Sequence, residues 1–103
     1  MLYWRELSGA KQQTALADAD KFFSEFPTPT VVLGQFQPKD GERFHKLAEE
    51  KLNSFDMPPK FSARAREGLL ASLIEAVADD ELGGEPYPDN RIADFHMLLL
   101  KED

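Results

Sequence analysis

The two histidines, His45 and His96, are candidates for chemistry, because imidazole serves both as a metal ligand and as a general base near neutral pH. His45 follows Glu42 by three positions, the spacing of one half of a carboxylate-bridged metal site in a helical bundle. The second half would need a glutamate three positions before His96, where the chain has an alanine. The remaining combination of zinc ligands has no regular spacing: His45, His96, Glu49 and Asp94. We therefore predict no metal site.

Nucleophilic catalysis would need a serine or cysteine beside a base and an orienting acid. The chain has no cysteine, which also removes disulfides and thiolate metal sites. No Gly-x-Ser-x-Gly turn surrounds any of the serines that fall in or beside expected helices: Ser24, Ser54, Ser62 and Ser72. The glycines do not have the spacing of a phosphate-binding loop. We predict a protein that is not an enzyme and that uses no cofactor; a small enzyme of unrecognised type is the weakest alternative.

Acidic residues form the one charged group with an unusual distribution. The 103 residues include 19 acids and 12 bases, which gives a formal net charge of −7. Seven acids and no Lys or Arg lie between Glu67 and Asn90, so the other acids are balanced by the bases. Such a surface repels phosphate backbones. We therefore predict a protein partner with a basic surface and no direct binding of nucleic acid.

Most of these acids belong to a helix that the sequence marks at both ends. Ser62 can accept a hydrogen bond as N-cap, and Gly83 can adopt the left-handed conformation that ends a helix. The apolar residues between them share an arc of about 140°: Leu69, Leu70, Leu73, Ile74 and Val77. The spacing predicts a helix with one buried face.

The charges on this helix oppose its macrodipole, because bases lie near its expected start and acids near its end. The bases are Lys60, Arg64 and Arg66, and the acids are Asp79, Asp80 and Glu81. Each such charge costs ~0.3–1 kcal/mol relative to the reverse order. One explanation is that neighbouring elements supply opposite charges, such as Arg91 for the acids. The other is that the acidic end binds a basic partner.

The expected binding surface continues into residues 85–89, where two prolines restrict the backbone on either side of Tyr87. Tyr87 is either an aromatic anchor beside acids or a residue packed on the edge of the core. The predicted partner-binding residues are Asp79, Asp80, Glu81, Glu85, Tyr87 and Asp89. We predict a non-catalytic module that inhibits or modulates its partner by occlusion. In the sharper version the carboxylates mimic nucleic-acid phosphates on a nucleic-acid-binding protein.

Two further helices are expected from apolar residues at helical spacing. The first runs from Ser8 or Gly9 to Phe26, and the second opens at residues 38–41 with Asp40 as its cap. The first carries Ala15, Leu16, Ala19, Phe22, Phe23 and Phe26, and the second carries Phe44, Leu47, Ala48, Leu52 and Phe55. We interpret the phenylalanine stripe as core and not as a ligand pocket.

Residues 30–36 and 95–100 can be read as helix or as strand. In the first segment β-branched residues favour a strand, whereas Thr28 followed by Pro29 favours a short helix, which we prefer. The predicted fold is mainly α, a compact single-domain bundle of four to five helices over residues 1–103. The alternative is an α+β fold with short strands in these two segments.

The segment from Asn90 to Lys101 is apolar on nearly all sides and is either buried or an interface. The alternative function is therefore a structural or self-associating subunit, a homodimer formed through Ile92, Phe95 and Leu99. No apolar run approaches the ~20 residues of a membrane span, and the first residues lack the layout of a signal peptide. We expect a cytoplasmic protein that does not associate with membranes.

Overall fold

Four helices form the described part of the computed structural model, which covers residues 9–55, 61–83, 92, 95–96 and 99. The helices are α1 (Gly9–Glu25), α2 (Pro29–Leu33), α3 (Pro38–Leu52) and α4 (Ala63–Leu82). No described residue lies in a β-strand, and Ile92, Phe95, His96 and Leu99 are helical. The mainly α fold is confirmed.

Local signals account for where the helices begin and end. The Ser62 hydroxyl accepts a hydrogen bond from the Ala65 amide at 3.1 Å, and Gly83 ends α4 with a φ of 66°. α2 begins as predicted, with Thr28 extended and Pro29 at its first position. The cap predicted for α3 is wrong, because Gln37 is the N-cap and Asp40 lies in the first turn. Pro38 fits the first helical position, where the amide hydrogen that it lacks is not needed.

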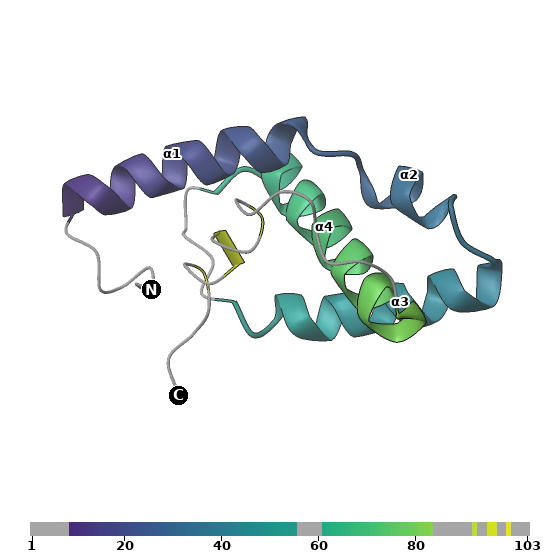
Figure 1. Cartoon of the computed structure of the whole chain (residues 1–103). Helices are drawn as coiled ribbons and strands as arrows, with labels where there is room; N and C mark the ends of the chain where they lie inside the picture. Colours follow the sequence, from purple (N-terminus) through teal and green to yellow (C-terminus); the bar gives the residue numbers. More distant parts are fainter. Residues whose placement is uncertain (1–8, 56–60, 84–91, 93–94, 97–98, 100–103) are drawn as a thin grey trace.

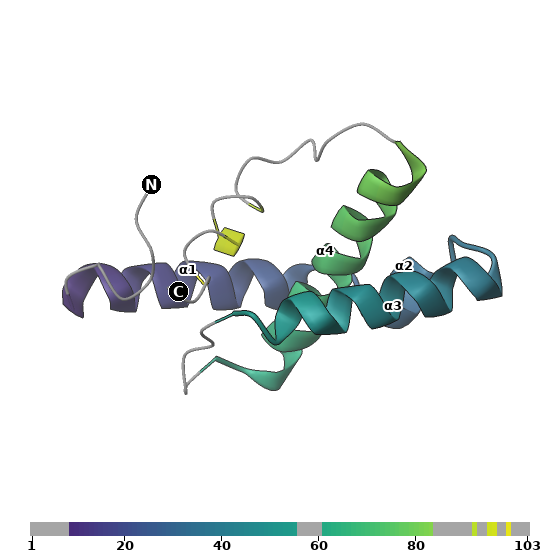
Figure 2. The same ribbon diagram turned by 90° about the horizontal axis from the view of Figure 1, so that it is seen from below.

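α4 is the helix on which the other three pack (Figure 1). Figure 2 shows α1 and α3 in one layer, with α4 passing between them and its C-terminal end projecting out of that layer. Buried residues of α4 extend beyond the predicted arc, because small residues let neighbouring helices approach its other sides. These additional buried residues are Ala65, Gly68, Ala71, Ser72 and Ala78.

The closest approach of α1 and α4 occurs at Gly68. A Cβ atom at this position would lie 1.8 Å from the carbonyl oxygen of Phe23 and 2.7 Å from its carbonyl carbon. Only a residue without a side chain allows this separation of the two backbones. Phe23, at the crossing, is fully buried. The core also contains the fully buried side chains of Phe44 of α3 and of Leu69 and Ile74 of α4.

Polar side chains join α1 and α4 beside this crossing. Asp20 of α1 accepts hydrogen bonds from the Ser62 amide at 2.8 Å and from the Ser62 hydroxyl at 3.2 Å. Arg64 of α4 donates through Nη2 to the carbonyl oxygen of Phe26 at 2.6 Å, just beyond the end of α1. Each helix therefore supplies the charge that the other helix's terminus favours, an acid at an N-terminus and a base at a C-terminus.

Candidate protein-binding site

The last turn of α4 carries three of the predicted partner-binding residues, Asp79, Asp80 and Glu81, called here the acidic end of α4. Asp80 and Glu81 are exposed, and Asp79 is partly buried. No base lies in this turn. Glu85, Tyr87 and Asp89 lie outside the described residues, as does Arg91, the base that we expected to compensate the acids.

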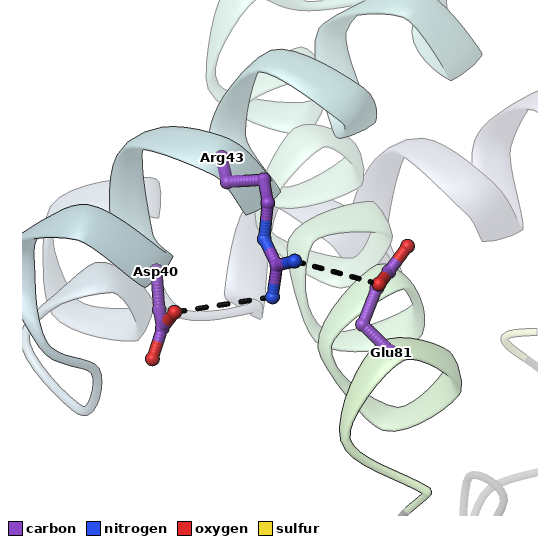
Figure 3. A network of polar contacts seen from close by, with 3 residues as sticks. All are labelled: Asp40, Arg43 and Glu81. Carbon is purple, nitrogen blue, oxygen red and sulfur yellow. Dashed lines mark ion pairs between the residues drawn. The ribbon is translucent and has the colours of Figure 1, made fainter.

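One basic side chain reaches this acidic end from α3. The Arg43 guanidinium lies between two carboxylates, 3.7 Å from Glu81 and 3.8 Å from Asp40 (Figure 3). The side chains of Arg43 and Glu81 are 52% and 39% exposed, so solvent screens the pair and it contributes little to stability. Among the described residues, neither Asp79 nor Asp80 forms an ion pair. The acidic end is therefore only partly compensated within the described chain.

Glu75 lies one turn before Asp79, and its pKa is affected by its surroundings. Partial burial raises the pKa of the Glu75 carboxyl, and the neighbouring Asp79 carboxylate raises it further. Both causes disfavour the ionised form. An approaching cation would relieve the repulsion between these carboxylates and favour that form.

A groove between α3 and α4, called here the α3–α4 groove, adjoins the acidic end and has a volume of about 430 Å³. Its apolar surface comes from Leu47 of α3 and from Ala76 and Val77 of α4. Its polar lining consists of Glu50, Lys51, Ser54, Asp80 and Glu81. The groove thus brings two of the predicted residues together with an apolar surface and a third acid.

A larger cavity of about 620 Å³ lies at the C-terminal end of α1. Phe22, Phe26 and Phe95 line it, so the phenylalanine stripe that we assigned to the core forms both core and cavity wall. Its charged residues are of both signs, namely Asp18, Lys21 and Glu25. Because this lining combines acidic and basic side chains, the cavity favours neither a cationic nor an anionic ligand. The lining of the smaller groove is mainly acidic.

Ser72, which is buried, and His96, which is partly buried, form a pair that the sequence did not reveal. The Ser72 hydroxyl donates to the Leu69 carbonyl at 2.7 Å, so it accepts from His96 Nε2 at 3.0 Å. The imidazole stacks on Phe23 with an interplanar angle of 5°. Burial, aided by Lys51, lowers the pKa of His96 to about 4. Ser72 has no exposed surface and has already donated its proton, so this serine is not an accessible nucleophile.

His45 lies on α3 and is partly exposed. Its Nε2 atom is 3.3 Å from a carboxylate oxygen of Glu49. His96 instead contacts Ser72 of α4. Within residues 9–55, 61–83 and the described residues beyond them, no three His, Asp or Glu side chains gather as a metal site would require. Asp94 lies outside the described residues.

The residues predicted to form a homodimer are used within the chain. Ile92 and Leu99 are 4% and 2% exposed. Phe95 packs against the core, and its ring centroid lies 5.4 Å from that of Phe22. A homodimer through these side chains stays a prediction, and it would require them to leave their present contacts. None of the described helices has the length and apolarity needed to cross a membrane.

Comparisons of the chain with protein-family models, with curated proteins and with solved structures gave no match. The function must therefore be argued from the geometry of this chain. The sequence located Asp79, Asp80 and Glu81 but missed the groove beside them. Ala76 and Val77 precede Asp80 and Glu81 by four residues, so each apolar residue neighbours an acid on the helix surface. This spacing was a usable signal for an apolar surface beside the acids.

Proposed function

We propose that this protein is a non-catalytic module that binds a basic surface of another protein and inhibits or modulates that partner by covering it. The observation that supports this proposal is the acidic end of α4. Its carboxylates lie on a projecting helix end, where the helix dipole disfavours them and where Arg43 is their one ionic partner among the described residues. A cationic partner would turn this unfavourable arrangement into a favourable one.

The partner class that suits this surface best is a nucleic-acid-binding protein. Exposed carboxylates at one helix end can occupy a basic surface that otherwise binds phosphates, because both are anionic acceptors of hydrogen bonds from Lys and Arg. The net charge of −7 adds long-range attraction to such a surface. Under this proposal, partner and nucleic acid compete for one basic surface.

The first experiment compares two triple variants with the same change in charge. Asp79→Lys, Asp80→Lys and Glu81→Lys reverse the acidic end, and Glu42→Lys, Glu49→Lys and Glu67→Lys reverse three exposed acids elsewhere. Both variants and the unmodified chain are immobilised, and proteins are captured from a native extract at about 50 and about 300 mM salt. We expect the acidic-end variant alone to lose a salt-sensitive partner.

We expect that variant to fold, because lysines at the end of α4 favour its dipole. Circular dichroism checks the helical content of all three proteins. If both variants lose the partner equally, net charge and not this surface is responsible, and the proposal fails. Once a partner is captured, displacement by duplex DNA or by RNA tests the phosphate mimicry. Sedimentation of the unmodified chain tests the homodimer, which would appear at micromolar concentration.

A further inference from the structure

The α3–α4 groove has an ordered arrangement of apolar and acidic side chains. On α4, Ala76 precedes Asp80 by four residues, and Val77 precedes Glu81 by the same interval. Residues four apart lie one above the other on a helix, about 6 Å apart along its axis. The wall that α4 contributes is therefore apolar for one turn and acidic for the next.

The α3 side of the groove gives this arrangement a direction. Leu47 extends the apolar surface, and Glu50 adds a third acid. Lys51 follows further along α3 and Ser54 lies just beyond its end, both away from the Arg43 end that contacts Glu81. A cationic ligand is thus favoured toward Asp80 and Glu81 and disfavoured toward Lys51.

We infer that the α3–α4 groove receives an amphipathic basic helix of the partner protein. One aliphatic side chain of that helix lies on Leu47, Ala76 and Val77, and Lys or Arg side chains one turn away face Asp80 and Glu81. This inference rests on the proposed function and adds the form of the partner to it. It follows from the charge complementarity of the groove together with its apolar surface.

The size and walls of the groove favour a helix over other basic ligands. Its volume of about 430 Å³ accommodates the side chains of about one helical turn and not a folded surface. The ridges of side chains on one helix pack into the grooves of a neighbouring helix. Binding of an amphipathic helix in such a groove uses apolar anchors at intervals of three and four residues. On the α4 wall the change from apolar to acidic side chains falls at the same interval of four residues.

The test uses the full chain and two synthetic peptides of ~15 residues made of Leu, Lys and Ala. In the amphipathic peptide the leucines share one helical face beside the lysines, and in the scrambled peptide of equal composition they do not. Fluorescence anisotropy gives the dissociation constants, and amide chemical shifts of the labelled protein locate the contacts. We expect the amphipathic peptide to bind about tenfold more tightly and to shift the amides of Leu47, Ala76 and Val77.

Protein variants separate this inference from the proposed function. Ala76→Leu fills the groove without changing its charge, and Ala76→Gln blocks it with a polar side chain if the first variant fails to fold. Either should weaken the amphipathic peptide about tenfold and the scrambled peptide less than about twofold. Asp80→Asn with Glu81→Gln should weaken both peptides, because both are cationic.

Each outcome decides one of the two claims. Equal binding of both peptides, lost with the acids but unaffected at Ala76, overturns the groove inference and leaves the proposed function intact. Binding of neither peptide, or binding that does not respond to the acids, overturns the proposed function itself. Self-association of the chain that Ala76→Leu abolishes also overturns the inference, because a second copy would then be the occupant.

Discussion

Both ends of α4 carry side chains of the sign that its macrodipole disfavours, but the neighbouring helices treat the two ends differently. At the N-terminal end, Arg64 donates a hydrogen bond to the carbonyl oxygen of Phe26. The Asp20 carboxylate accepts one from the Ser62 amide and supplies the negative charge that a helix start favours. At the C-terminal end, the acids project from the layer of α1 and α3 and meet only the exposed Arg43 among described residues. The first arrangement is explained by folding, whereas the second is not.

The two ends show which unfavourably placed charges indicate function. A charge that opposes a dipole gives no information when a neighbour with defined hydrogen bonds accounts for it. It becomes informative when its partner is solvent-exposed and screened, as Arg43 is at 52% exposure.

The largest effect is expected from Gly68→Ala, which disrupts the crossing beside the compensated end. The new methyl group would meet the Phe23 carbonyl oxygen at 1.8 Å, so α1 must move away and its hydrogen bonds with Ser62 must break. We expect the free energy of unfolding to fall by about 3 kcal/mol or more, measured by urea denaturation. Gly34→Ala is the matched control, since its nearest atom lies at 3.4 Å. A loss in Gly68→Ala no larger than in the control would contradict the packing described.

The next effect is a dependence of stability on pH, and it concerns the His96 side chain that contacts Ser72 in the middle of α4. The folded protein protonates His96 near pH 4, whereas the unfolded chain does so near its ordinary pKa of 6.5. The unfolded state therefore binds more protons between these values, and stability falls as the pH decreases from 6.5 to 4. The loss should approach about 3 kcal/mol in urea denaturation at successive pH values.

The control for this pH effect is a difference between variants, because carboxyl groups titrate in the same range. His96→Leu should lose most of the decrease in stability between pH 6.5 and 4, whereas His45→Leu should retain it. An unchanged pH dependence in His96→Leu would mean that the imidazole is not the group that titrates.

A smaller loss is expected from Asp20→Ala at the compensated end. The variant leaves the Ser62 amide and the hydroxyls of Ser62 and Ser24 without their shared acceptor. We expect a loss of about 2 kcal/mol in thermal or urea denaturation. Asp18→Ala removes an exposed acid from the same helix and should change stability by less than about 0.5 kcal/mol. Equal effects would show that Asp20 acts only through its charge.

The smallest effect, of opposite sign, is expected at the acidic end. Replacing Asp79 and Asp80 by Asn removes two charges that the dipole disfavours, so stability should rise by about 0.5–1 kcal/mol. The pKa of Glu75, measured by carbon NMR, should also move down toward its ordinary value, because Asp79 contributes to its elevation. A loss of stability would mean that these acids have structural partners, which would contradict the proposed binding role of this end.

The sequence predicted those features whose signals lie within one helix. The cap at Ser62, the end at Gly83 and the apolar stripes depend on residues a few positions apart, and the structure contains all three. The start of α3 was misplaced because Asp40 is a good capping residue by type, while the proline at residue 38 was the stronger indicator.

The remaining features depend on residues distant in sequence. Asp20 and Ser62 are 42 residues apart, and no local pattern links them. The buried side of α4 was underestimated because small residues carry little apolar signal, although Gly68 determines the closest contact. For the candidate site, the acids were found from charge alone. The apolar wall on α4 has a signal in the sequence, but the groove itself does not, because it exists only where Leu47 of α3 meets Val77 of α4.

The dependence of three helices on α4 has a consequence for synthesis of the chain. Ribosomes build a protein from its N-terminus, so α1, α2 and α3 emerge before the helix on which each of them packs. Phe23 and Phe44 then have no apolar partner on α4 until residues 63–82 have followed. A nascent chain stopped before that point would expose these rings and be a target for chaperones, whereas one extended through α4 has the means to bury them.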